Sequence, residues 1–197
     1  MPIAINGSGT ITGVSVGGLP DGIVDTDMLA NGAATAVKRG PGSILQIVST
    51  TVTAASTATM STNGEVTLMS RTYTPTLSSS NALIQVALHL DMDGAYGGMF
   101  LNLLRDSTAV ARGDAAGNRR QVTMVPDLST STFGGNLLGF TILDTGISGT
   151  SEVTYKVNIL DQSSGGGQYF MNTGRDNTNN NYILRAVSTL TVMEVAV

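Results

Sequence analysis

Residues 82–92, ALIQVALHLDM, alternate cleanly between two kinds of side chain. Successive side chains of a β-strand point to opposite sides, so one face of this segment collects large apolar groups: Ile84, Val86, Leu88, Leu90 and Met92. The opposite face carries Gln85, Ala87, His89 and Asp91. A period of two over this length predicts a half-buried strand packed against a core through its apolar face.

Strand-like segments continue from Ser43 to the end of the chain. They are separated by turn signals such as Thr62-Asn63-Gly64 and cover residues 43–52, 65–76, 82–92, 99–106, 107–113, 119–125, 137–144, 152–160, 168–172 and 182–197. About eight to ten short strands with turns between them favour an antiparallel sandwich or barrel. The sequence therefore predicts an all-β domain over residues 43–197.

The last predicted strand is apolar on both faces. Its apolar side chains extend to the carboxyl end of the chain and include Leu190, Val192, Val195 and Val197. Two explanations remain open. The strand is central in a sheet, or one of its faces is covered by another subunit, which makes these four residues candidates for a subunit interface.

Residues 1–42 have a different composition from the predicted domain. The stretch 5–22, INGSGTITGVSVGGLPDG, is rich in glycine, which costs more backbone entropy to order than any other residue. We expect an extended arm here, with short strand-like pieces such as Thr10-Ile11-Thr12. A helix of at most two or three turns is expected within 25–39, capped by Asp25 or Thr26 and ended by Gly40-Pro41-Gly42.

Composition excludes several classes of partner. Charged residues make up 12% of the chain, only Lys38 and Lys156 are lysines, and the net charge is −4. Such a surface has no electrostatic footprint for nucleic acid or an anionic membrane. There is no cysteine and no long apolar run, so we expect neither thiolate metal sites nor a signal peptide or membrane span.

No set of residues has the pattern of a catalytic or metal site. GVSVG at 13–17 matches the hydrolase elbow, but it lies in the glycine-rich arm without a helix behind it. His89 is the only histidine and is expected on the non-core face of its strand. Asp91 and Asp93 imitate the start of a calcium loop that lacks its later ligands, and we interpret them as hairpin-turn residues. We expect a non-enzyme without a cofactor or metal.

Several stretches resemble a known family. The opening residues 4–46, together with LLRDST (103–108), TYKVNI (154–159), YFMN (169–172) and STLTVMEVA (188–196), are similar to tail-fibre-like virion proteins of bacteriophages, particularly marine and cyanobacterial phages. The resemblance implies a jelly-roll-like β-sandwich with an extended N-terminal arm, assembled as a homotrimer in the virion, without catalytic residues. The chain lacks a long shaft, which favours a short tail appendage or a capsid-decoration (cement) protein, assembled in the host cytoplasm.

In this interpretation the arm orders by adding its backbone to a trimer mate or to another virion protein of the capsid or tail. Its larger apolar side chains then enter pockets on that partner: Ile3, Ile5, Ile11, Val14 and Val16. An arm folded back on its own domain is the alternative.

The main rival function is a receptor-binding tip that recognises a host-surface glycan. Tyr96, Tyr169 and Tyr182, with the loop 172–181, offer aromatic stacking and hydrogen bonds for a sugar. A polysaccharide-degrading spike needs paired carboxylates in a cleft, and the sequence offers no clear candidate.

Overall fold

The computed structural model describes residues 4–5, 11–12, 33–93, 98–126, 135–162, 166–176 and 178–197. The chain divides into two compact units, Met1–Lys38 and Arg39–Val197. In the first unit, β1 (Ala4–Ile5) and β2 (Ile11–Thr12) pair antiparallel, with Ile5 opposite Ile11. Residues 11–12 are thus a strand, as expected from their sequence.

The helix expected within 25–39 is reduced, in its described part, to the 3-10 turn η2 (Ala36–Lys38). Lys38 N donates to Thr35 O at 2.9 Å, which closes this turn. Val37 is 79% exposed, so the described residues 33–39 have no buried apolar face that would stabilise a longer amphipathic helix. The candidate caps Asp25 and Thr26 lie outside the described residues.

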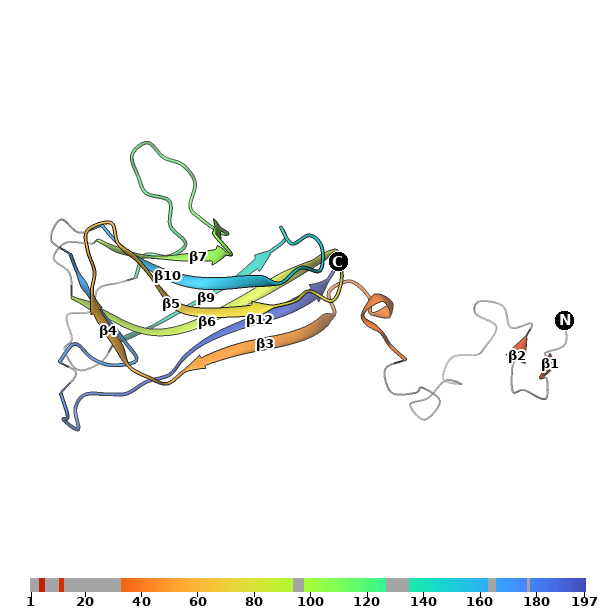
Figure 1. Ribbon diagram of the computed structural model, residues 1–197, viewed down its shortest axis with the longest axis horizontal. Helices are drawn as coiled ribbons and strands as arrows, with labels where there is room; N and C mark the ends of the chain where they lie inside the picture. Colours follow the sequence, from red (N-terminus) through yellow and green to blue (C-terminus); the bar gives the residue numbers. More distant parts are fainter. Residues whose placement is uncertain are drawn as a thin grey trace. The chain divides into compact units, whose positions relative to one another are not determined.

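The second unit is built from two antiparallel sheets (Figure 1). The four-stranded sheet has the order β5 (Glu65–Tyr73), β10 (Val153–Asp161), β7 (Met99–Arg105) and β8 (Thr108–Ala109). The other sheet runs β3 (Ile44–Val52), β12 (Ser188–Ala196), β6 (Ser80–Asp93), β11 (Gln168–Met171) and β4 (Ser56–Thr59), and β9 (Asn136–Asp144) pairs with β6.

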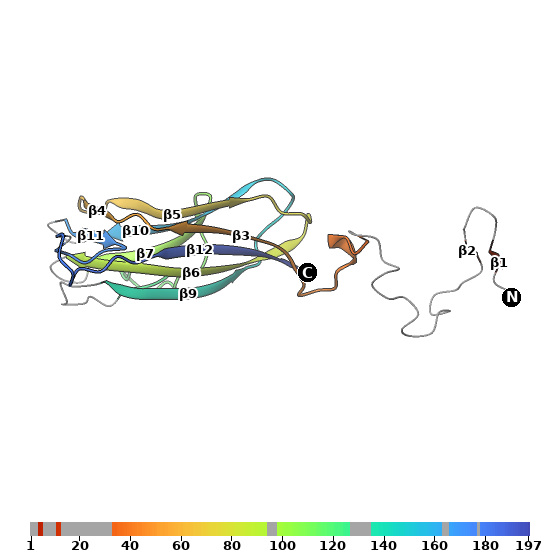
Figure 2. The same cartoon turned by 90° about the horizontal axis from the view of Figure 1, so that it is seen from below.

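The strand order is that of a jelly roll. Leaving out β4 and β11 and numbering β3, β5, β6, β7, β8, β9, β10 and β12 from 1 to 8 gives the sheet orders 1-8-3-6 and 2-7-4-5. Two interleaved four-stranded sheets of this kind, made from two Greek keys, define the fold. Figure 2 shows β3, β12, β6 and β9 side by side in this order. The expected jelly-roll-like antiparallel β-sandwich is therefore confirmed.

The core lies between the two sheets, and β6 supplies its inner face as its sequence predicted. Ile84, Val86, Leu88 and Leu90 are at most 2% exposed. They belong to the same hydrophobic cluster as side chains of β10 on the facing sheet, such as Val157. Burying a large apolar side chain contributes about 1.5–3 kcal/mol, so each of these β6 side chains adds substantially to the stability of the fold.

Four segments differ from the sequence prediction. Residues 119–125 form a single bridge, Met124 to Leu101, and no strand. Residues 107–113 contribute only the two-residue β8, and 182–187 lie outside strand β12. The sequence predicts no strand over the polar segment 56–59, yet this segment forms β4 because β11 supplies its hydrogen-bonding partners. The turn at Thr62-Asn63-Gly64 is present, with Asn63 at φ 60°.

Candidate interaction surface

The outer face of the sheet β3–β12–β6–β9 carries an apolar row that crosses all four strands. Met193 of β12 lies opposite Ile47 of β3 on one side and opposite Leu83 of β6 on the other. Leu83 in turn lies opposite Leu143 of β9. Directly opposed residues in antiparallel strands have Cβ atoms about 4.5–5.5 Å apart, so the four side chains form one continuous row.

A second pair extends this row toward the end of β12. A register shift between Glu194 and Val195 places Val195 opposite Ile44. We call the six residues Ile44, Ile47, Leu83, Leu143, Met193 and Val195 the apolar band. Within the band Ile47 is 59% exposed, Leu143 50% and Ile44 47%, so much of its surface faces outward in the single chain.

Beyond the band the outer face is mostly polar, apart from small residues and Leu137 of β9, which is 64% exposed opposite His89. The next row contains Ser49, Thr191, Gln85 and Thr141, which are aligned across the same four strands. The Ser49 and Thr191 hydroxyls are hydrogen-bonded to each other at 2.9 Å. Where the four strands are paired with one another, the only outward-facing titratable side chain is that of His89, which is half-buried. Asp91 and Asp93 lie further along the same face of β6, where both form ion pairs with Arg175.

The four interface candidates of the last strand differ in their exposure to solvent. Leu190 and Val192 are fully buried in the core of their own chain, so they have no surface left for another subunit. Val195 is half-buried on the outer face, and Val197 is 67% exposed. β12 is a central strand between β3 and β6, so the first explanation from the sequence holds for its inner face. Leu190 and Val192 are therefore corrected to core residues.

The predicted docking residues of the arm are only partly described. Ile5 and Ile11 lie opposite each other in the β1–β2 pair. Ile3, Val14 and Val16 lie outside the described residues. Docking of these five side chains on a partner stays a prediction.

A buried carboxylate that the sequence analysis missed lies next to the band. Glu194 has no exposed surface and points inward from β12. It accepts hydrogen bonds from Gln46 Nε2 at 2.6 Å, from Thr76 N at 2.9 Å and from Leu77 N at 3.1 Å. Burial alone would raise the pKa of Glu194, but these donors outweigh it and lower the pKa below its usual value. An acid at an inward position of an apolar alternation is the signal that could have identified it.

A second polar cluster joins the two sheets. Asp144 at the end of β9 accepts two hydrogen bonds from Arg105 Nη1 of β7, at 2.7 and 2.8 Å. The Tyr155 hydroxyl of β10 donates to the same carboxylate at 2.7 Å, and burial with this contact raises the pKa of Tyr155. Gly146 N adds another donor at 2.9 Å. The cluster has the partners expected of a structural link between sheets.

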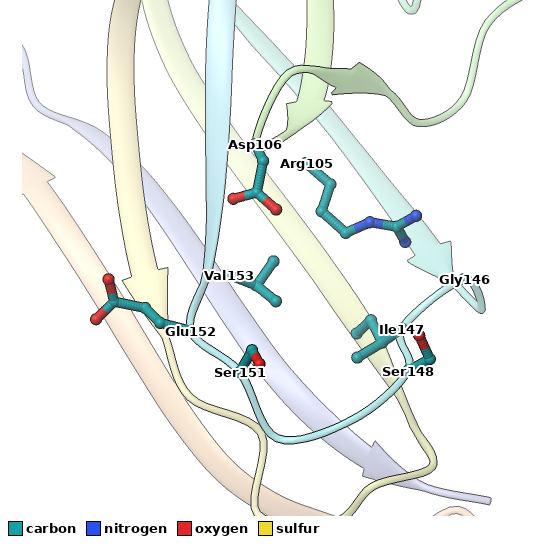
Figure 3. Close-up of a pocket in the computed structure, with 8 residues that line it drawn as sticks. All are labelled: Arg105, Asp106, Gly146, Ile147, Ser148, Ser151, Glu152 and Val153. Atoms are coloured by element: carbon teal, nitrogen blue, oxygen red, sulfur yellow. The ribbon is translucent and has the colours of Figure 1, made fainter.

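A pocket of about 250 Å³ opens beside this cluster (Figure 3). Eight residues line it: Arg105, Asp106, Gly146, Ile147, Ser148, Ser151, Glu152 and Val153. Arg105 holds Asp144, and the Asp106 carboxylate accepts from Thr154 N at 2.9 Å. Among these lining residues Ser148 and Ser151 supply hydroxyls, and Asp106 and Glu152 supply carboxylates.

His89, Asp91 and Asp93 do not come together as a site. His89 is half-buried on the outer face, as predicted. Asp91 is 2% exposed within β6 and accepts from Arg175 Nε at 3.2 Å, so its assignment to a hairpin turn was wrong. The residue lies in the strand because β11 pairs with β6 as far as Asp93. Over the described ranges no group of three or more His, Cys, Asp or Glu side chains is arranged to hold a metal ion.

The three tyrosines considered for glycan binding have different environments. Tyr169 is 5% exposed within β11, so its assignment as an exposed stacking residue was wrong. Tyr182 is 66% exposed. Tyr96 lies outside the described residues. In the part of the chain that the structure describes, no helix is long and apolar enough to cross a bilayer.

Comparisons with known proteins give only a distant structural likeness. No protein-family model and no curated protein matches the chain. Its solved neighbours include the VP2 subviral particle of infectious bursal disease virus (17% identity, TM-score 0.39, 77% of this chain, 38% of that chain). A structure of the Gx strain of that virus is another neighbour, with 18% identity and a TM-score of 0.37; the match covers 77% of this chain and 37% of that chain. The chain spans less than two fifths of these proteins, and at such TM-scores the likeness carries no functional conclusion.

Proposed function

We propose that this protein is a non-enzymatic structural component of a bacteriophage virion. In the proposal it is a homotrimeric short tail appendage or capsid-decoration (cement) protein, anchored through its N-terminal arm. The observation that carries the proposal is a jelly roll whose sheet β3–β12–β6–β9 exposes the uncharged, partly apolar outer face described above. Jelly rolls are common among capsid and lectin domains, and a face of this composition favours assembly with another protein surface.

The proposed division of labour follows the composition of the chain. Residues 43–197 form the jelly-roll head, and residues 1–42 form the attachment arm. The resemblance of the arm to phage tail-fibre-like proteins supports this division, as do its glycines, which let a backbone approach a partner closely. The apolar arm residues Ile3, Ile5, Ile11, Val14 and Val16 are the proposed anchors.

The position of the protein on purified particles tests this function. Immunogold labelling should give copies spread over the shell for a decoration protein, or a few copies at the tail for an appendage. Protein mass spectrometry of the same particles supplies an independent check. Absence of the chain from purified virions would overturn the proposal.

A receptor-binding tip is the second candidate, favoured by one exposed loop region. Tyr182 and Leu184, just after the asparagine-rich residues 179–181, are 66% and 63% exposed. Aromatic and amide groups side by side are suited to sugar stacking and hydrogen bonding. Binding of the full chain to immobilised host-surface polysaccharide, lost in Tyr182→Ala and retained in Val125→Ala, would favour this function; no binding would contradict it.

A further inference from the structure

We propose that the apolar band is the surface through which copies of this chain associate, with a second copy as its occupant. This inference rests on the homo-oligomeric part of the proposed function and adds which face of the jelly roll is used. It also corrects the interface residues expected from the sequence: Leu190 and Val192 are replaced by outward-facing residues, chiefly Ile47, Leu83 and Leu143.

The band is continuous, and it lies on a rigid support. The row Ile47–Met193–Leu83–Leu143 crosses four hydrogen-bonded strands, whose inner faces are anchored in the core. The backbone of paired strands is already fixed, so burying these side chains costs only their own rotamer freedom. Association through this face therefore costs less ordering entropy than association through a loop.

The charge distribution favours a second copy as the occupant. The chain carries a net charge of −4, so two copies repel each other unless they meet through neutral surfaces. Where all four strands lie side by side, their outward residues include no Asp, Glu, Lys or Arg. Asp91 and Asp93 follow on the same face of β6, beyond the end of its pairing with β9, and both form ion pairs with Arg175. A neutral face complements itself, whereas a nucleic acid or an anionic bilayer requires basic groups that this face lacks.

Burying the polar neighbours of the band also costs little. The Ser49 and Thr191 hydroxyls already bond to each other at 2.9 Å, and Ser49 Oγ also donates to Leu190 O at 3.3 Å. Polar groups that keep their hydrogen bonds can leave water with a smaller penalty than unpaired ones. The row next to the band can therefore become part of the interface.

The size of the face is adequate for association. About eight residues at ~3.3 Å along each strand and four strands at ~4.8 Å give about 500 Å² in projection. Two copies that each contribute this area bury about 1,000 Å², the lower limit for a specific interface.

Light scattering on the full chain at micromolar concentration tests the inference. The wild-type protein should have a mass well above the 20.2 kDa of one chain: about twice that mass where two copies meet face to face, and about three times where the copies close the ring of the proposed homotrimer. Ile47→Glu and Leu143→Glu each place a carboxylate in the band, and each should reduce the mass to that of one chain. Leu184→Glu and Val125→Glu are matched controls, because these side chains are 63% and 62% exposed but lie outside the band, and they should leave the mass unchanged.

Thiol labelling supplies a readout that does not depend on a disruptive charge. The chain has no cysteine, so Ile47→Cys, Leu143→Cys and Leu184→Cys each introduce a single reactive site. At high protein concentration the first two should react with a maleimide at least ten times more slowly than on dilution to nanomolar concentration. Leu184→Cys should react at the same rate at both concentrations.

The outcomes separate the two proposals. A monomeric wild-type protein overturns both the proposed homotrimer and this inference. An oligomer that persists in Ile47→Glu and Leu143→Glu, with fast labelling of both cysteine variants, leaves the homo-oligomer intact and overturns the assignment of this face. Labelling that is slow at every dilution identifies the chain's own arm as the occupant instead, which also overturns the inference.

Discussion

At the scale of single residues, Glu194 links two distant parts of the chain. Its carboxylate is enclosed between β12, the side chain of Gln46 on β3, and the backbone of Thr76 and Leu77 in the loop after β5. A buried charge is tolerated only when its hydrogen bonds replace those lost from water, and here the donors come from two segments, β3 and the loop after β5. Glu194 thus secures the loop between the two sheets.

We expect Glu194→Gln to lower the free energy of unfolding by about 1–3 kcal/mol, because an amide cannot accept every bond that the carboxylate accepts. Urea unfolding at pH 7 measures the loss. Glu152→Gln is the matched control, since Glu152 is exposed in the loop before β10, and it should change stability by less than about 0.5 kcal/mol. Equal effects of the two variants would contradict this role of Glu194.

The stabilisation by Glu194 should depend on pH in a definite direction. The pKa of Glu194 in the folded chain lies below its ordinary value of 4.5. The unfolded chain therefore binds a proton first on acidification, so the stabilisation is complete above pH 4.5 and is lost as the pH falls through the folded pKa. The difference in unfolding free energy between wild type and Glu194→Gln should shrink across this acidic range. A difference that stays constant would contradict the lowered pKa.

At the scale of elements, β12 shows how one strand serves two surfaces. Its side chains alternate between buried and half-buried along the whole strand, because successive side chains point to opposite faces and one face packs on the core. β3 and β6 pair with its two edges. The inner face contributes Leu190, Val192 and Glu194, and the outer face contributes Met193 and Val195 to the apolar band.

Truncating one residue on each face of β12 should separate these roles. Leu190→Ala leaves a cavity in the core and should cost about 2–5 kcal/mol in the unfolding free energy of the chain. Val195→Ala, on the half-buried outer face, should cost less than about 1 kcal/mol when unfolding is measured on dissociated chains. Similar losses in both variants would show that the two faces are not distinguished in this way.

At the scale of the whole molecule, the first and the last residues of the jelly roll lie next to each other. Ala196 N donates to Ser43 O, and Gly42 N donates to Ala196 O, both at 2.9 Å. The residues that follow the arm are thus fixed to the last strand of the fold. The core cluster described for residues 39–197 fills the space between the two sheets of this unit.

Deletion of residues 1–22 should therefore leave the jelly roll folded and abolish attachment to virions. Circular dichroism and thermal melting test folding, and binding to particles that lack the full-length protein tests attachment. A deletion variant that unfolds would place the arm in the core. One that folds and still binds particles would place attachment on the jelly roll.

Thermal melts with and without a chelator should overlay for the whole protein. Asp91 is occupied by Arg175, and within the described ranges no cluster of acidic or histidine ligands offers the coordination that a bound cation needs. Differential scanning calorimetry in the presence of EDTA, with added calcium as the comparison, measures this. A decrease of several degrees on chelation would restore a calcium role for Asp91 and Asp93.

The sequence by itself determined those features that depend on neighbours along the chain. A period of two assigned Ile84 to Leu90 to the core, the Asn-Gly pair marked the turn at residue 63, and the apolar character of the last strand on both faces was visible before its environment was known. Local alternation is sufficient here because a strand exposes its two faces independently of its partners.

Only the tertiary structure decided which strands are neighbours, because strand pairing joins residues far apart in sequence. It made a strand of the polar segment 56–59 by pairing it with β11, and left 119–125 with a single bridge. It buried Asp91 and Tyr169, and it gave Glu194 the backbone donors of a loop 117 residues away at its nearest. The alignment of Ile47, Met193, Leu83 and Leu143 arises in the same way, since four separate strands contribute one residue each.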